Sequence, residues 1–480
     1  MALTPRQFRR LHTRRAFLDQ CAGGLGCGVL SHLMGIEGRL AAAPSVDGLA
    51  PRAPHFAPKA KNVIFLFMEG APSQMDLFDP KPELAKWHGK PLPASMTKDL
   101  QLAFIKPTTT VMASPRQFSR HGASGMEISD FLPHTATIAD EICLVRSMYT
   151  EAFNHHPGQA LLMSGSQFFG RPTIGSWVSY GLGNESRDLP AFVVLSSGRG
   201  TSGGSNNWTN GFLPSQYQGV VFRNTGDPIP YLSNSPGVTP ELQRLSLDTL
   251  RELNRERCQM TGDGEIEARM AAYELAFRMQ VSAPDLLDFS KEPAHILDMY
   301  GVNDKVKRPY AVNCLLARRM VERGVRFVML AHASWDDHSE LNKKLKENCD
   351  ITDQPAAALV RDLKQRGLLD STLVIWGGEF GRTPMAEMRR PRDADSAGRD
   401  HHPAGFSMWL AGGGIGGGRI IGKTDDFGLR VVSDGVHIHD LQATALHCLG
   451  IDHKRLTYRH MGRDFRLTDV AGEVVRPMLR

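Results

Sequence analysis

The sequence contains few cysteines, and those that it has follow no known motif. Seven occur among the 480 residues, two of them within the first 43 residues. The remaining five are widely separated and form no C-x-x-C pair: Cys143, Cys258, Cys314, Cys349 and Cys448. This spacing argues against a disulfide framework and against a cysteine-bound zinc site. It is still compatible with one or two individual disulfides.

Long hydrophobic runs, a large net charge and a nucleotide-binding loop are also missing. The apolar stretch at residues 21–34 is short and rich in glycine, which makes it a poor membrane span. We expect no stable membrane span in the chain once the N-terminal segment that contains this stretch has been cleaved. The formal net charge of +5 includes six arginines of the first 43 residues, so the rest of the chain is near neutral and we expect no nucleic-acid binding. The glycines at 412–418 precede a strand rather than a helix, which argues against a phosphate-cradling loop.

Residues 1–43 form a predicted export signal. Residues 13–18 (TRRAFL) resemble a twin-arginine motif, and small residues at 41–43 follow the apolar stretch as a signal-peptidase site. An uncleaved anchor is the main alternative. A lipobox at Gly26-Cys27 is disfavoured because no aliphatic residue stands three positions before the cysteine. We expect export to the periplasm or the cell surface, and the twin-arginine route favours a metalloprotein because it carries folded proteins.

After a Pro/Ala-rich linker at 44–61, short apolar runs alternate with helical patterns. The runs are typical of buried strands in an α/β sheet: 62–68, 142–148, 191–195, 324–331, 372–376, 405–410 and 429–432. We predict that residues 62–480 form a single domain with a doubly wound, mainly parallel sheet and helices on both faces. Insertions are expected at about 196–237, as a long loop, and at about 241–300, which is largely helical.

Polar residues gather where the predicted strands end. The stretch 371–418 is central: it reads as a strand, a polar turn, a variable basic loop, a second polar turn and a strand. Open α/β sheets carry their sites beyond the carboxyl ends of their strands. The carboxylate and histidine residues at these ends are Asp76, Asp79, His155, His156, Asp336, His338, Glu379, His401, His402 and His439. Each alone could be a helix cap or an ion-pair partner, but their recurrence is typical of two-metal phosphoryl- and sulfuryl-transfer enzymes.

Several motifs together resemble one known family. They are FLFMEGAPSQMDLFDPKP, NHHPGQALLMSG, RPTIGSWVSYGLG, SWDDH, GGEFGRTP, GRDHHPAGFSMWLAGGGIGGG and HIHDLQATALHCLGID. They resemble the twin-arginine-exported bacterial family known as domain of unknown function 1501, over essentially the whole chain after the signal. That family is similar to a branch of the alkaline phosphatase and sulfatase superfamily. The resemblance implies an alkaline-phosphatase-like fold and a metal-dependent hydrolase site.

The superfamily pattern carries over only in part. Asp336 and His338 match its Asp and His after one strand, while Glu379-Phe380 stands where an Asp-His pair is expected. His402 or His401 fits the last histidine, and Glu69 stands in place of the first aspartate, with Asp76 further on. The chain has no Cys-x-Pro-x-Arg sulfatase signature, which argues against formylglycine chemistry. Ser73 and Ser164 are the remaining candidates for a nucleophile.

These observations predict an exported, metal-dependent hydrolase of phosphate or sulfate esters. The expected ion is a divalent zinc, calcium, manganese or magnesium ion. Its predicted ligands are Asp76, Asp336, His338, Glu379, His401 and His402. Residues assigned to catalysis and to binding an anionic small molecule or polysaccharide are Ser73, His155, His156 and Arg382. The alternative is a catalytically inactive member that binds an anionic polysaccharide or serves a cell-surface complex.

Overall fold

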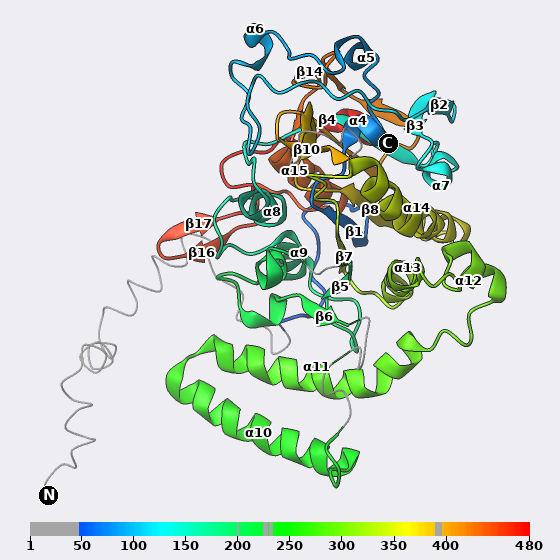
Figure 1. Cartoon of the computed structure of the whole chain (residues 1–480). Coiled ribbons are helices and arrows are strands. Elements are labelled where there is room, and N and C mark those ends of the chain that lie inside the picture. Colours follow the sequence, from blue (N-terminus) through cyan, green and yellow to red (C-terminus); the bar gives the residue numbers. More distant parts are fainter. Residues whose placement is uncertain (1–47, 199–200, 224–228, 230–233, 389–395) are drawn as a thin grey trace, which may run out of the picture. The chain divides into compact units, whose positions relative to one another are not determined.

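In the part of the chain that this computed structural model describes, nine strands form one central sheet (Figure 1). They are β1 (Asn62–Glu69), β4 (Ile142–Tyr149), β5 (Phe192–Gly198), β6 (Val220–Phe222), β7 (Phe327–Ala333), β8 (Thr372–Gly377), β11 (Phe406–Ala411), β12 (Arg419–Ile421) and β15 (Val436–His437). Their order is β12-β4-β11-β8-β1-β7-β5-β6, with β15 also paired to β4. All pairs are parallel except those of β11 with β8 and β4. The predicted mainly parallel sheet is confirmed.

The strand β1 shows why these segments are so apolar. All eight of its residues are buried. Its side chains alternate between two hydrophobic cores: Ile64, Leu66 and Met68 enter one, whereas Val63 and Phe65 enter the other. Successive side chains of a strand point to opposite faces, so a strand covered on both faces must be apolar throughout.

Helices cover both faces of the sheet, as a doubly wound fold requires. Helices α12 (Ala294–Tyr300), α13 (Arg308–Glu322) and α14 (Leu341–Gln365) supply the first core. Helices α8 (His155–Ser164), α9 (Ile174–Leu182) and α15 (Ile438–Cys448) supply the second. The predicted arrangement of helices on both faces is therefore confirmed.

The structure describes residues 48–198, 201–223, 229, 234–388 and 396–480. The predicted signal at 1–43 lies outside them. Residues 49–480 form one unit. Within it, part of the expected linker pairs with the fold, since the amides of His55 and Lys59 donate to the carbonyls of Gly450 and Cys448. The cysteines of the described part, which are the five beyond the signal, are all free.

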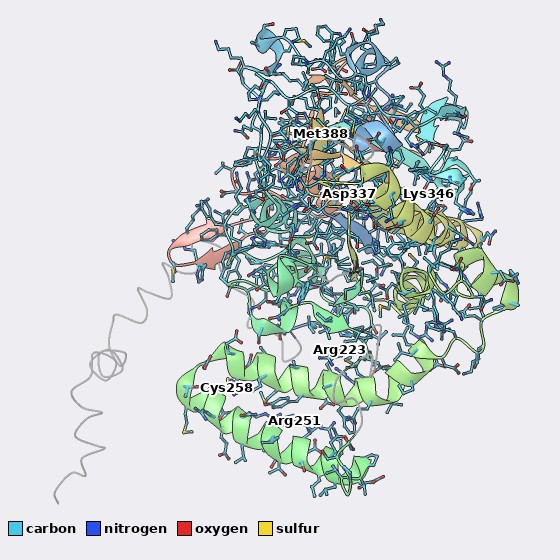
Figure 2. All side chains as sticks on the ribbon, viewed as in Figure 1. Arg223, Arg251, Cys258, Asp337, Lys346 and Met388 are labelled. Carbon is cyan, nitrogen blue, oxygen red and sulfur yellow. The ribbon has the colours of Figure 1, made fainter. Side chains whose placement is uncertain are left out.

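The helical insertion consists of α10 (Pro240–Thr261) and α11 (Gly264–Leu287). Gly262 ends α10 with φ at 65°, and the Asp263 side chain caps α11. Arg251 and Cys258 mark α10 in Figure 2. Neither these helices nor any others in the described ranges combine the length and the apolar character needed to cross a membrane.

Shorter elements complete the described chain. The helices are α4 (Gln74–Leu77), α5 (Glu83–Trp87), α6 (Ala94–Thr97) and α7 (Pro133–Ala136). Single 3₁₀ turns occur at η1 (Gly204–Trp208), η2 (Ser215–Tyr217), η3 (Leu369–Ser371) and η5 (Arg476–Met478). Three small antiparallel pairs are β2 (Phe118–His121) with β3 (Met126–Ser129), β13 (Lys423–Thr424) with β14 (Val431–Ser433), and β16 (Tyr458–His460) with β17 (Arg463–Phe465).

A fourth antiparallel pair corrects the sequence prediction. β9 (Gly381–Glu387) and β10 (Gly398–His402) stand where two polar turns were predicted, and every residue in both strands is buried. The prediction of turns was wrong because these polar side chains find partners in the interior. Arg399, for example, pairs with Asp76 at 2.9 Å, and both side chains are buried. Residues 389–395 between the strands lie outside the described residues.

Candidate metal centre

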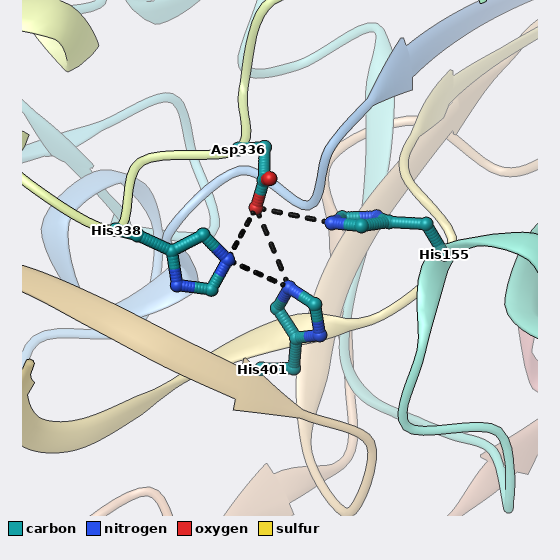
Figure 3. A group of neighbouring side chains, drawn as sticks. All are labelled: His155, Asp336, His338 and His401. Carbon is teal, nitrogen blue, oxygen red and sulfur yellow. Dashed lines mark hydrogen bonds and ion pairs between the residues drawn. The ribbon is translucent and has the colours of Figure 1, made fainter. Parts of the chain in front are cut away.

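Four side chains from three segments meet in one group: His155, Asp336, His338 and His401 (Figure 3). His155 is the first residue of α8, and His401 lies on β10. Asp336 and His338 belong to the short segment between β7 and α14, beyond the carboxyl end of β7. Gly398 lets β10 approach that segment, because a Cβ atom there would lie 2.1 Å from the carbonyl carbon of His338.

The Nε2 atoms of the three histidines converge on one carboxylate oxygen. Asp336 Oδ1 lies 3.0 Å from the Nε2 atom of His155, 2.8 Å from that of His338 and 3.4 Å from that of His401. The Nε2 atoms of His338 and His401 are 3.0 Å apart. Three imidazoles and a carboxylate form a donor set suited to a borderline divalent cation.

The opposite ring nitrogens are all held by acceptors. His155 Nδ1 lies 2.7 Å from Glu379 Oε1, and His338 Nδ1 contacts Glu387 Oε2. His401 Nδ1 donates to the carbonyl oxygen of Phe153 at 3.0 Å. Metal-binding histidines in proteins are oriented in this way, with the second nitrogen bonded to a carboxylate or a carbonyl.

The carbonyl of Phe153 fixes the tautomer of His401. A carbonyl only accepts, so His401 Nδ1 carries the proton and its Nε2 atom has a free lone pair when the ring is neutral. That lone pair faces His338 Nε2. The buried Nε2 atom of His155 makes no well-aligned hydrogen bond within the described residues. These nitrogens therefore suit a cation or a proton at the centre of the group.

One side of the group is open to solvent. The Asp336 side chain is 45% exposed, whereas that of His401 is 1% exposed. Arg382 lies on the buried side, and its Nη2 atom donates to Asp336 Oδ1 at 2.7 Å. An open position beside protein ligands distinguishes catalytic metal sites from closed structural ones.

The four groups are strongly coupled electrostatically. Burial disfavours the charged form of His155, but the carboxylates of Asp336 and Glu379 outweigh it and raise its pKa to about 9. Burial lowers the pKa of His401 to about 4. Burial opposes ionisation of Asp336, but contacts with the three histidines and Arg382 hold its pKa well below the usual range. The metal-free group thus keeps an ionised Asp336 beside a protonated His155.

This coupling predicts a measurable titration in the metal-free protein. The His155 ring should lose its proton near pH 9 rather than near the unperturbed value of about 6.5. Because the folded pKa is the higher one, the stabilisation is fully present below about pH 6.5 and is lost as the pH rises toward 9. NMR titration of the histidine side chains tests this, with Glu379→Gln expected to lower the midpoint. An unshifted midpoint would contradict the geometry.

Other predicted site residues lie around this group rather than in it. Glu379 holds His155, and it also accepts from the amide of Gly70. The Arg382 side chain is completely buried, and besides Asp336 it donates to the carbonyls of Ala71 and Arg399. The sequence assigned Arg382 to substrate binding, whereas these contacts give it a part in supporting Asp336.

His402, the neighbour of His401, is turned away from the group. Its Nε2 atom donates to the carbonyl of Leu429 at 3.0 Å, and burial lowers its pKa to about 4. Asp76 pairs with Arg399 and accepts from Ser73 Oγ at 2.5 Å, so both predicted residues face an internal ion pair. His156 is exposed and lies 6.3 Å from the Phe169 ring.

Three groups important to the centre were not assigned to it from the sequence. They are Glu387, the carbonyl of Phe153 and the carboxylate of Asp400, which accepts from the amide of His401. Glu387 and Asp400 also form a second potential ligand group with His338. No sequence signal identifies a main-chain carbonyl as a histidine partner. The position of Glu387 depends on β9 being a strand, and the polar sequence of β9 does not predict a strand.

Comparison with known proteins gave matches of two kinds. A sequence profile described as "Protein of unknown function (DUF1501)" matches residues 60–479. The chain is structurally similar to a Pseudoalteromonas sp. sulfatase (14% identity, 85% of this chain and 69% of the sulfatase, TM-score 0.35). It is also similar to a Silicibacter pomeroyi phosphonate monoester hydrolase (11% identity, 72% of this chain and 71% of the hydrolase, TM-score 0.35). Another similar structure is an alkaline phosphatase of the Antarctic bacterium TAB5 (11% identity, 82% of this chain and 99% of the phosphatase, TM-score 0.31). The search of curated proteins gave no match.

Proposed function

The chain belongs to the DUF1501 family, and on this premise we propose that it is an exported, metal-dependent hydrolase of phosphate or sulfate esters. The observation that carries the proposal is the convergence of three Nε2 atoms on Asp336 Oδ1, with each Nδ1 atom held by an acceptor. Simple ion pairs do not need three rings aimed at one point with their second nitrogens all fixed.

The residues of the group and those around it would have different tasks. Asp336, His155, His338 and His401 would hold the ion, which supplies Lewis-acid polarisation of the ester when bound. Glu379 and Glu387 hold the rings of His155 and His338 in position. Arg382 keeps Asp336 ionised and oriented. The exposed edge of Asp336 leaves room for an anionic ester and for water.

The donor set favours zinc among the four ions expected from the sequence. Calcium and magnesium prefer oxygen ligands, whereas this group offers three imidazole nitrogens and a single carboxylate. Zinc accepts histidine and carboxylate ligands and leaves a position open in catalytic sites. We therefore expect the group to bind zinc, with manganese as the next best ion.

Elemental analysis tests the choice of metal. Protein that is purified after export and not refolded should carry near-stoichiometric zinc. After chelation, zinc should restore the thermal stability of the loaded protein, and calcium and magnesium should not, because binding to the folded state raises stability by mass action. Protein that takes up no metal, even after dialysis against an excess, would overturn the proposal.

One observation favours the alternative of a binding protein without catalysis. Neither predicted nucleophile reaches the group: Ser73 Oγ donates to Asp76, and Ser164 Oγ donates to the carbonyl of Ala160. Hydrolysis would then require direct attack by water. A screen of phosphate and sulfate esters with the zinc-loaded protein, alongside binding assays with sulfated polysaccharides, separates the two functions. Turnover supports the enzyme, and binding without turnover supports the alternative.

A further inference from the structure

An exposed aromatic residue, Phe104, lies against the candidate metal centre. Its ring centroid is 5.1 Å from that of His338 and 5.5 Å from that of His401, and both contacts are edge-to-face. The side chain is nevertheless 63% exposed. Because this exposed ring contacts two candidate ligands, it is placed to meet a molecule that binds at the group.

Phe104 is held in this place by a buried carboxylate. Asp400 Oδ2 accepts from three consecutive amides, those of Ala103 and Phe104 at 2.9 Å and that of Ile105 at 3.2 Å. Three successive amides around one anion form a stable nest, and charge-assisted hydrogen bonds are among the strongest in proteins. The position of Phe104 is therefore fixed by the fold.

The same carboxylate also accepts a hydrogen bond from the backbone of a candidate ligand. Asp400 Oδ1 accepts from the amide of His401 at 2.9 Å, so one buried side chain joins the Phe104 loop to the strand that carries a candidate ligand. A second aromatic residue is tied to that ligand as well, because the carbonyl of Phe153 accepts from His401 Nδ1 and the Phe153 side chain is exposed. The backbone of both exposed aromatic residues is thus held near His401.

We propose that Phe104 is a stacking platform for the group esterified to the anion. Phe104 contacts His338 and His401, so an ester bound at the group would have its alcohol part within reach of the exposed Phe104 side chain. The ligand class is then a phosphate or sulfate ester of a ring with a flat apolar face, either a sugar or an aryl ring. This inference rests on the proposed function, since it takes the anion to sit at the group His155, Asp336, His338 and His401.

Non-hydrolysable anions test the platform directly. The zinc-loaded protein is titrated with phenylphosphonate, with the methylene phosphonate analogue of glucose 1-phosphate, and with methylphosphonate, which has no ring. Phe104→Ala should weaken binding of a ring-bearing probe roughly tenfold, as expected for loss of an aromatic contact, and should leave methylphosphonate binding unchanged. Phe104→Tyr should keep the affinity, because it retains the ring.

The chain offers a matched control in Phe168. It is 80% exposed and has no ring contact with the centre in the part of the chain that the structure describes, so Phe168→Ala should bind every probe like the unmodified protein. A loss confined to phenylphosphonate assigns an aryl ester, and a loss confined to the sugar analogue assigns a saccharide ester; either supports the platform.

Two results would overturn the inference and are distinguishable from each other. If Phe104→Ala weakens all three probes equally, or none, Phe104 does not contact the ring, and the proposed function is untouched. If the unmodified protein holds zinc but binds none of the probes, the proposed function fails and the platform fails with it. Zinc content, measured for every variant, shows whether the centre itself is intact.

Discussion

Replacing His338 by alanine is expected to remove the metal from the protein. The change deletes one of three converging imidazoles and leaves Glu387 without its histidine partner. Loss of a residue that only orients a ligand costs about 10- to 100-fold in metal affinity, so loss of a ligand should cost about 100-fold or more. Any ester hydrolysis should fall with the metal. Zinc content and a zinc titration against a competing chelator measure the effect.

His156→Ala is the matched control for that experiment. This change also removes an imidazole, that of the residue next to His155, but His156 is exposed and outside the group. Metal content should stay at the level of the unmodified protein. Circular dichroism and the melting temperature after chelation establish that His338→Ala still folds. Retention of zinc by a folded His338→Ala protein would show that the ligand set is misassigned.

Replacing Asp76 by alanine is expected to destabilise the fold severely without removing the metal site. Arg399 would remain buried with its carboxylate partner lost, and breaking a buried ion pair from one side costs about 3–5 kcal/mol. Burial opposes ionisation of Asp76, but Arg399 with Ser114 and Ser73 still lowers its pKa, so the pair is charged at neutral pH. Urea denaturation measures the loss in the free energy of unfolding.

Asp370→Ala provides the comparison. Asp370 pairs with Arg480, and both side chains are more than half exposed, so its removal should cost below about 1 kcal/mol. Asp76 was also predicted from the sequence as a metal ligand. If Asp76→Ala lost zinc while its free energy of unfolding stayed unchanged, that role would be correct and the structural role would be wrong.

Most of the fold could be predicted from the sequence because its central strands are buried on both faces. The continuous apolar runs of β1, β7 and β8 identify such strands without any knowledge of their partners. The hairpin β9–β10 could not be predicted in this way. Its polar residues can be buried only because they form hydrogen bonds with carbonyls and carboxylates distant in the sequence. Arg382, for example, donates to the carbonyl of Ala71.

The candidate site was predictable to the level of segments, and the exact side chains were not. The histidine pair after Asp400 indicated a ligand, but neighbouring residues on a strand point to opposite faces. The structure therefore brings His401 to the group and turns His402 toward Leu429. A sequence pattern cannot make this choice, because it depends on which face of β10 meets the segment after β7.

The distances along the chain between the parts of this centre bear on when a metal could enter. His155 meets Glu379 across 224 residues, and His401 meets Phe153 across 248. The growing polypeptide contains all of these groups only once His401 has been made, so the proposed ion would bind after the long-range contacts of the sheet have formed. The proposed export of the folded chain would then make the supply of metal on the side where folding takes place decide which ion the protein carries.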